Sequence, residues 1–205
     1  MLDHLVYAVP DLERAVDEIE RQVGVRPASG GTHGGGLTHN ALLSLGARSY
    51  LEVIARVPGI EAPSGALPFG LETLTEPRLV AWAVPVDDIE QRVEGARAAG
   101  YDPGEMIAGG RDLPDGSHLG WQLVVRQEPA GGGIVPFLIR WLSEPHPSAT
   151  APKGCRFVSL RAEHPQPDTV IDILQALGVE FRVSEGDTPR LIATLETPNG
   201  TVELS

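Results

Sequence analysis

The stretch Leu2-Asp3-His4-Leu5-Val6-Tyr7-Ala8-Val9-Pro10 decides how the rest of the chain is interpreted, because its ending returns later. It is short, β-branched and aromatic, and it stops at proline, which is typical of a strand. Residues 79–85, Leu-Val-Ala-Trp-Ala-Val-Pro, repeat both its character and its Ala-Val-Pro ending. After each stretch an aspartate precedes apolar residues at helical spacing, and a glycine ends the run. Two copies of a strand-then-helix plan are therefore predicted.

Further strands complete each copy. The first helix is predicted from Asp11 to about Val23, and the second through residues 89–99. In the first copy a glycine-rich loop at 30–36 precedes strands at 38–45 and 49–55. The second copy adds strands at 118–125 and 134–142. A third, shorter copy has a strand at 157–162, a helix at 168–177 and strands at 181–183, 190–195 and 201–204, the last two joined by Pro198-Asn199-Gly200, a strong hairpin signal.

The recurrence of one element order says more about the fold than any single motif. It predicts an α+β protein built from repeated βαβββ modules. The expected organisation is a first module at 1–56, a linker at 57–78, a second module at 79–147, and a third, shorter module at 148–205 packed on the same domain.

The composition excludes several classes of partner. The 205 residues carry a formal net charge of −12, and such a surface repels nucleic acid and anionic membranes. The single cysteine, Cys155, allows no internal disulfide and no multi-thiolate metal site. The first residues, Met1-Leu2-Asp3-His4, do not show the basic and then apolar pattern of a signal peptide, and no apolar run reaches membrane-spanning length, so we expect a cytoplasmic location.

Several motifs together resemble the glyoxalase-like branch of the vicinal oxygen chelate (glyoxalase/bleomycin resistance/extradiol dioxygenase) superfamily. They are residues 2–6, 38–46, 50–54, 111–121 (Arg-Asp-Leu-Pro-Asp-Gly-Ser-His-Leu-Gly-Trp), 136–141 and 145–148 (Pro-His-Pro-Ser). The resemblance implies paired modules whose curved mixed sheets form a cleft for a small-molecule ligand. In catalytic members a divalent metal in the cleft takes its ligands from the first and last strands of each module. A homodimer is also consistent with the resemblance.

The metal positions implied in the first module are His4 and Glu52. An imidazole and a carboxylate suit Zn²⁺, Mn²⁺, Fe²⁺ or Ni²⁺. Alignment of the copies places apolar residues, Leu79 and Ile139, opposite them in the second module, while the third copy places Glu203 opposite Glu52. A catalytic metal usually needs about three protein ligands.

A replacement ligand would have to come from another histidine. His39, which opens a strand beside the first, is the best candidate, and His118 and His33 are weaker ones. For each of them a histidine that binds nothing is the alternative, and a buried, purely structural pair is the alternative for His4 and Glu52.

Aromatic and charged side chains are candidates for contacts to a ligand. Tyr7, Trp82 and Trp121 could line an apolar pocket, although aromatic residues in strands also form ordinary core. Arg140 would contact an anionic ligand or face solvent. His118 is a further candidate for a ligand contact.

Two functions stay open at this point, and the sequence does not decide whether the chain is an enzyme. One is a metal-assisted lyase, isomerase or dioxygenase for a small oxygenated substrate, in which Glu52 or Glu203 moves the proton. The other is a metal-free protein that binds or sequesters an apolar or aromatic metabolite or drug. The divalent metal is accordingly a candidate cofactor that the second function does not require.

Overall fold

The computed structural model describes residues 2–112 and 118–205, so the middle of the motif at 111–121 lies outside the described residues. The chain divides into two compact units, each made of three segments. The His4 unit comprises His4–Val80, Pro145–Ser159 and Ala193–Ser205. The Trp82 unit comprises Met1–Asp3, Ala81–Glu144 and Leu160–Ile192. Residues assigned to the third module are therefore divided between the units, and the module boundaries given above stay a prediction.

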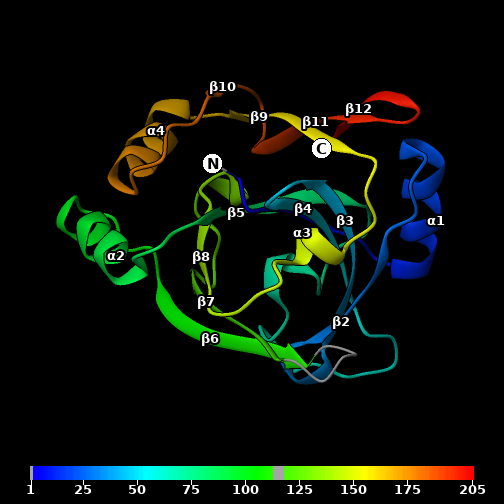
Figure 1. Cartoon of the computed structure of the whole chain (residues 1–205). Helices are drawn as coiled ribbons and strands as arrows, with labels where there is room; N and C mark the ends of the chain where they lie inside the picture. Colours follow the sequence, from blue (N-terminus) through cyan, green and yellow to red (C-terminus); the bar gives the residue numbers. More distant parts are fainter. Residues whose placement is uncertain (1, 113–117) are drawn as a thin grey trace. The chain divides into compact units, whose positions relative to one another are not determined.

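The first βαβββ module lies in the His4 unit (Figure 1). Its elements are β1 (His4–Ala8), α1 (Leu12–Val23), β2 (Ala28–His33), β3 (Thr38–Gly46) and β4 (Ser49–Arg56). Their strand order is β2-β3-β4-β1. β4 runs antiparallel to β3 and parallel to β1, so the module begins and ends on neighbouring strands.

Helix α1 forms where the sequence predicts it, because both of its ends are capped. The side chain of Asp11 accepts a hydrogen bond from the backbone N–H of Arg14, and Gly24 ends the helix with φ +77°. One face of the helix is buried through Ala15, Val16, Ile19 and Val23. Burial of such an apolar stripe supplies most of the stability of a short helix in a protein.

The second module repeats the plan of the first. Its elements are β5 (Arg78–Pro85), α2 (Ile89–Ala98), β6 (Glu105–Asp112), β7 (His118–Val125) and β8 (Phe137–Trp141). Their strand order is β6-β7-β8-β5, with β8 parallel to β5 and antiparallel to β7. Because first and last strands are neighbours in both modules, the internal repeat is confirmed at the level of strand pairing.

The strand after the helix is the element that the sequence analysis missed in both modules. Residues 30–33 of the predicted glycine-rich loop belong to β2, which pairs with β3, and β6 pairs along its length with β7. Gly-Gly pairs lie within both strands. The prediction of a loop over residues 30–33 was wrong because cross-strand pairing outweighs the poor intrinsic strand preference of glycine.

The third copy keeps the element order but changes the strand order. It comprises β9 (Arg156–His164), α4 (Pro167–Ala176), β10 (Val183–Glu185), β11 (Arg190–Thr197) and β12 (Gly200–Leu204), preceded by the short helix α3 (Pro147–Thr150). The strands are ordered β10-β9-β11-β12, with β9 parallel to β10. The opening strand β9 thus lies between β10 and β11, whereas β1 neighbours the last strand of its module. Glu203 lies on the edge strand β12, which neighbours β11 and not the opening strand β9, and its role in moving a proton stays a prediction.

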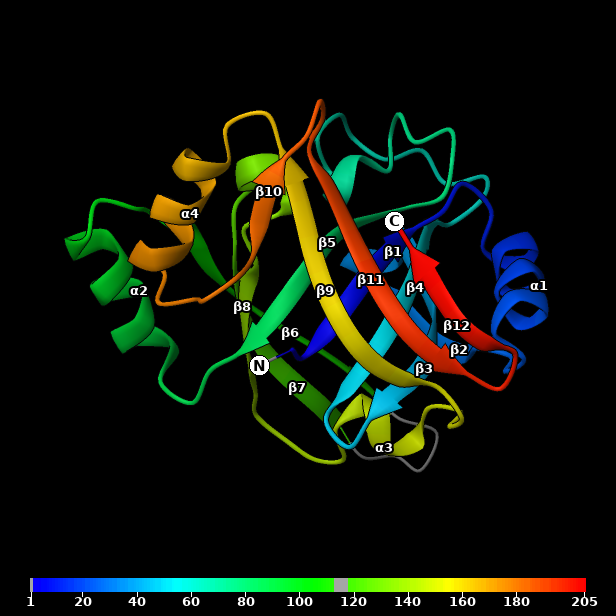
Figure 2. The ribbon, with the colours of Figure 1, turned by 90° about the horizontal axis from the view of Figure 1, so that it is seen from above.

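The expected fold class is confirmed: the chain is α+β, with βαβββ modules, curled sheets and a third partial module. Short 3₁₀ turns at Gly34–Gly36, Pro68–Gly70 and Ala130–Gly133 connect strands. Within the Trp82 unit, α2 and α4 lie side by side in both views of the ribbon (Figures 1 and 2). In the described part of the chain, no helix has the length and apolar character that crossing a membrane requires.

Candidate functional site

One face of the β3-β4-β1 array carries the polar residues of the candidate site. His4 is paired with Tyr50 across β1 and β4, and Glu52 is paired with Leu42 across β4 and β3. Paired residues point to the same side of a sheet, and side chains alternate along each strand. His4, Asn40, Tyr50 and Glu52 therefore share a single face, which we call the His4 face.

Glu52 is held on this face by two polar neighbours. Nδ2 of Asn40 donates a hydrogen bond to Oε1 of Glu52 over 2.6 Å. Oε2 of Glu52 lies 3.9 Å from Nε2 of His4, and the side chains of His4 and Glu52 are 5% and 13% exposed. One carboxylate oxygen is thus occupied by a neutral donor, and the other faces an imidazole at a separation longer than a hydrogen bond.

The ring of His4 belongs to a row of three aromatic rings, those of His4, Tyr50 and His146, which we call the aromatic column. The His4 ring stacks on Tyr50 with 4.6 Å between ring centroids, and Tyr50 meets His146 edge to face at 5.7 Å. Nδ1 of His146 accepts from the backbone N–H of Ser148 at 3.2 Å. The Ser148 hydroxyl lies 2.8 Å from that Nδ1 and donates to the carbonyl oxygen of Ala47 over 2.8 Å. His146 is buried, so the column is anchored in the protein interior.

Asn40, Tyr50 and His146 were not predicted as site residues. All three lie in motifs quoted for the resemblance, residues 38–46, 50–54 and 145–148. Strand alternation around Glu52 could have identified Asn40 and Tyr50, because each shares its face. His146 could not have been found this way, since it reaches Tyr50 from a segment more than ninety positions along the chain.

The donor set on the His4 face does not fit a catalytic metal centre. His4 and Glu52 are brought together, but among the described residues no group of three or more His, Cys, Asp or Glu side chains could hold a metal ion. His39 is paired with Ala55 and alternates with Asn40, so it points to the opposite face of the sheet. Its Nε2 is buried and has no hydrogen-bond partner among residues 2–112 and 118–205. Glu203 is exposed on β12 and accepts a hydrogen bond from Thr194 at 3.4 Å.

Two aromatic residues predicted to contact a ligand have other surroundings. Tyr7 is paired with Val53 and therefore lies on the face opposite to Glu52. Burial raises the pKa of the Tyr7 hydroxyl, and the nearby carboxylate of Glu18, on helix α1, raises it further. Trp82 is 4% exposed, and its indole N–H donates to the carbonyl oxygen of Ile134 at 2.7 Å. The surroundings of Trp82 are those of a core residue.

Arg140 belongs to the Trp82 unit and is held by a neighbouring carboxylate. Its Nη1 and Nη2 donate to the two oxygens of Glu90, each over 2.7 Å, and its Nε donates to Oε1 of Gln122 over 2.8 Å. Hydrogen bonding from this guanidinium holds the pKa of Glu90 below its ordinary value. Its predicted contact to an anionic ligand would have to compete with this bidentate ion pair.

Trp121 and His118 also lie in the Trp82 unit, on β7. Trp121 meets Trp141 edge to face at 5.7 Å. Both side chains cover glycines of β6, since a Cβ on Gly109 would lie 2.5 Å from Nε1 of Trp121, and one on Gly110 would lie 2.3 Å from Nε2 of His118. Their proposed contacts with a ligand stay predictions.

Comparison with known proteins identifies relatives of the fold. The family model described as "Glyoxalase-like domain" matches residues 2–178. A hypothetical protein from Staphylococcus aureus is 18% identical with a TM-score of 0.63, over 98% of this chain and 83% of that one. Methylmalonyl-CoA epimerase from Mycobacterium tuberculosis is 20% identical with a TM-score of 0.44, over 73% of this chain and 91% of that one.

The epimerase from Streptomyces coelicolor, in complex with 2-nitronate-propionyl-CoA, is 16% identical with a TM-score of 0.45, over 69% of this chain and 97% of that one. A search of curated proteins found no match. At these identities, the similarity to the Staphylococcus aureus protein indicates a shared fold and nothing about the reaction.

Proposed function

This chain belongs to the glyoxalase-like domain family of the vicinal oxygen chelate superfamily, and from that premise we propose that it binds a small oxygenated molecule on the His4 face. We further propose that Glu52 exchanges a proton with the bound molecule while the imidazole of His4 hydrogen-bonds one of its oxygens. The observation that carries this proposal is the Glu52 carboxylate, fixed at one oxygen by Asn40 and turned with the other toward His4.

The geometry of this pair suits acid–base chemistry. Proton transfer requires a carboxylate held in one orientation, and the Asn40 amide together with the surrounding strands restricts Glu52. Nε2 of His4 and Oε2 of Glu52 lie 3.9 Å apart, which is longer than a hydrogen bond, so a ligand oxygen placed between them could contact both groups. A ligand hydroxyl can donate to Oε2 of Glu52 and accept from Nε2–H of His4, which makes an oxygenated molecule a better match than a purely apolar one.

This proposal assigns the chemistry to the chain's own side chains. A divalent metal would be held by His4 and Glu52 and would polarise a ligand oxygen, but two protein ligands fall short of the usual three. No step is therefore assigned to a metal. The alternative of a protein that only captures its ligand shares the same face and differs in predicting no proton exchange.

Ligand-observed NMR with a panel of small 2-oxo acids, 2-hydroxy acids and hydroxyaldehydes tests the proposal. Panel members that bind are then incubated with the protein in D₂O, and deuterium incorporation is followed by ¹H NMR. We expect Glu52→Gln to reduce incorporation by about 10²–10⁴-fold, the range typical of a lost general base. His4→Gln is expected to weaken binding of the same compound.

Glu203→Gln provides the matched control, because it removes a carboxylate from the edge strand β12 and leaves the His4 face unchanged. Equal effects of Glu52→Gln and Glu203→Gln would contradict the assignment of Glu52. Binding without any incorporation by the wild type would favour a capture protein over an enzyme.

A further inference from the structure

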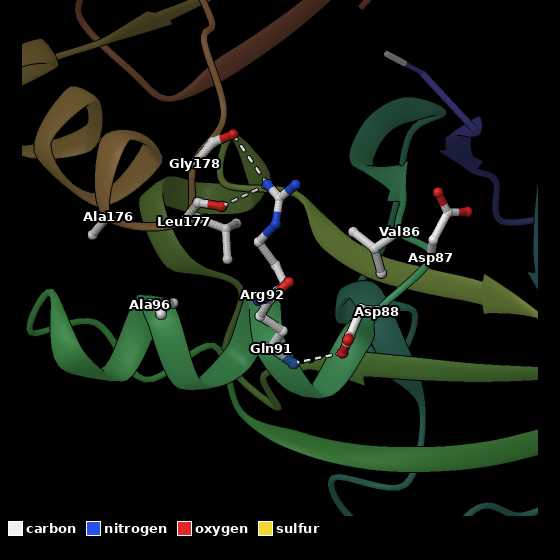
Figure 3. A pocket seen from close by; sticks show the side chains of 10 residues that line it. Val86, Asp87, Asp88, Gln91, Arg92, Ala96, Ala176, Leu177 and Gly178 are labelled. Atoms are coloured by element: carbon white, nitrogen blue, oxygen red, sulfur yellow. Dashed lines mark hydrogen bonds between the residues drawn. The ribbon is translucent and has the colours of Figure 1, made fainter.

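The Trp82 unit contains a surface pocket of about 500 Å³ beside helix α2 (Figure 3). Its walls are residues of α2, the segment 86–88 before it, and Ala176 at the end of α4 with the two residues that follow it. The volume lies within the range of small-molecule sites in proteins. All of the lining residues belong to the same unit.

Arg92 crosses the pocket and is anchored at one end of its guanidinium. Nη1 donates to the carbonyl oxygens of Leu177 and Gly178, each over 3.1 Å. Within the described residues, Nε and Nη2 of Arg92 have no hydrogen-bond partner. Figure 3 shows Nη2 on the side of the guanidinium where Val86 and Asp87 lie. The pocket therefore contains a fixed cation with an unused pair of parallel donors, which matches a carboxylate.

Carboxylates supply the opposite charge on the neighbouring wall. Asp88 caps α2 by accepting at Oδ1 from the backbone N–H of Gln91 over 2.8 Å. In the described part of the chain, Asp87 makes no hydrogen bond or ion pair, and it is exposed. The ammonium group of a ligand could therefore pair with the Asp87 carboxylate without breaking an interaction that Asp87 makes with the described residues.

From these two walls we propose that the pocket binds a small aliphatic zwitterion of the amino-acid type, through a carboxylate on Arg92 and an ammonium group on Asp87. The aliphatic part would lie over Val86 and in the open space beside Gly95. A neutral polyol is a poorer match, because its hydroxyl groups gain little over water in a pocket open to solvent. This site is separate from the His4 face and does not depend on the function proposed there.

Gly95 provides a test that preserves the helix. It lies in the interior of α2 and lines the pocket, and a Cβ at this position would have no atom of the described residues within 4 Å. Leucine has a better helix propensity than glycine, so Gly95→Leu fills the pocket without a helix penalty.

The experiment is a titration of the ¹⁵N-labelled full-length protein with L-leucine, followed at the backbone amides of Gly95 and Gly178 and at the Nε–H of Arg92. We expect saturable shifts with L-leucine. 4-Methylpentanoate lacks the ammonium group, and 3-methylbutylamine lacks the carboxylate. Each is expected to bind up to about fivefold more weakly than L-leucine, because each loses one solvent-exposed ion pair.

Variants separate the pocket from the rest of the surface. Gly95→Leu is expected to abolish the shifts, Asp87→Asn to weaken binding about fivefold, and Glu94→Gln, which changes an exposed carboxylate of α2 outside the pocket lining, to leave binding unchanged. Absence of saturable shifts with L-leucine, or equal affinity for L-leucine and glycerol, would overturn the proposal. Shifts that persist in a folded Gly95→Leu protein would overturn it as well.

Discussion

Gly30 lies so close to Asn40 that a Cβ at position 30 would stand 2.2 Å from Oδ1 of Asn40. Gly30 falls at the irregularity in the pairing of β2 with β3, and the space that it leaves holds the amide that donates to Glu52. Oδ1 of Asn40 is buried, and no described residue forms a hydrogen bond with it. The hydrogen bond from Asn40 that orients the Glu52 carboxylate on β4 therefore depends on glycine, which has no side chain, at position 30 on β2.

Gly30→Ala is expected to lower the free energy of unfolding by about 1–3 kcal/mol, because the new methyl group overpacks against Asn40 and Leu42. Urea unfolding followed by circular dichroism measures the change. Gly95→Ala is the matched control: it lies in a helix with open space around it, and a gain of up to about 1 kcal/mol is expected there. An unchanged free energy of unfolding in Gly30→Ala would show that Asn40 moves aside at little energetic cost.

The hairpin between β11 and β12 also caps a helix. Nδ2 of Asn199 donates to the carbonyl oxygens of Arg21 and Gln22, in the last turn of α1. Asn199→Ala removes these donors and is expected to cost about 0.5–1.5 kcal/mol of unfolding free energy. Asn199→Asp should cost more, because it also places a negative charge at the negative end of the helix dipole.

Salt distinguishes the two contributions. The difference between Asn199→Asp and Asn199→Ala should shrink in 1 M NaCl, since screening weakens the charge–dipole interaction. Equal stability of the two variants at low ionic strength would count against the electrostatic contribution.

The pair of Glu90 and Arg140 predicts a pH dependence with a definite sign. Hydrogen bonding from Arg140 lowers the pKa of Glu90 below its ordinary value of 4.5. A depressed carboxylate pKa contributes stability above the unfolded-state value and loses it as the pH falls through the folded-state value. Glu90→Gln should therefore be less stable than the wild type at pH 7, and the difference should vanish in acid.

Solvent screening limits the size of this effect, because Glu90 is on the surface. Thermal unfolding of the wild type and Glu90→Gln between pH 2.5 and 7 measures it, with Glu94→Gln on the same helix as the control. A difference that grows as the pH falls would contradict the assigned sign.

Metal content tests the donor set directly. Because His4 and Glu52 are two ligands where about three are usual, we expect well under one equivalent of Zn²⁺, Mn²⁺, Fe²⁺ or Ni²⁺ to stay bound after gel filtration. Elemental mass spectrometry of the untagged protein measures the retained metal. Near-stoichiometric metal that is lost in His4→Ala would contradict this expectation and return the reaction to metal-assisted chemistry.

The sequence predicted elements whose signals are local. Helix α1, with Asp11 and Gly24 at its ends, and the hairpin at Pro198-Asn199-Gly200 both form as expected. The glycine-containing strands β2 and β6 were missed, because the reason for their glycines lies on a neighbouring strand. Gly30 makes room for Asn40, and Gly109 makes room for Trp121. Such cross-strand contacts leave no periodic signal within one segment.

The candidate site was predictable only in part for the same reason. His4 and Glu52 were expected to meet, and they do. His39 was selected by residue type, but strand alternation turns it to the opposite face. The contact of His146 with Tyr50 depends on tertiary packing between segments far apart in sequence, which residue types and spacing do not encode.

The interleaved segments of the two units have a consequence for synthesis on the ribosome. The His4 unit takes its last segment from Ala193–Ser205, so the strands that carry His4 and Glu52 emerge long before their unit is complete. The intervening Trp82 segments are also translated before that point. The His4 unit therefore cannot be completed segment by segment as the chain emerges, and its early strands are exposed to chaperones or to aggregation until residues 193–205 have been synthesised.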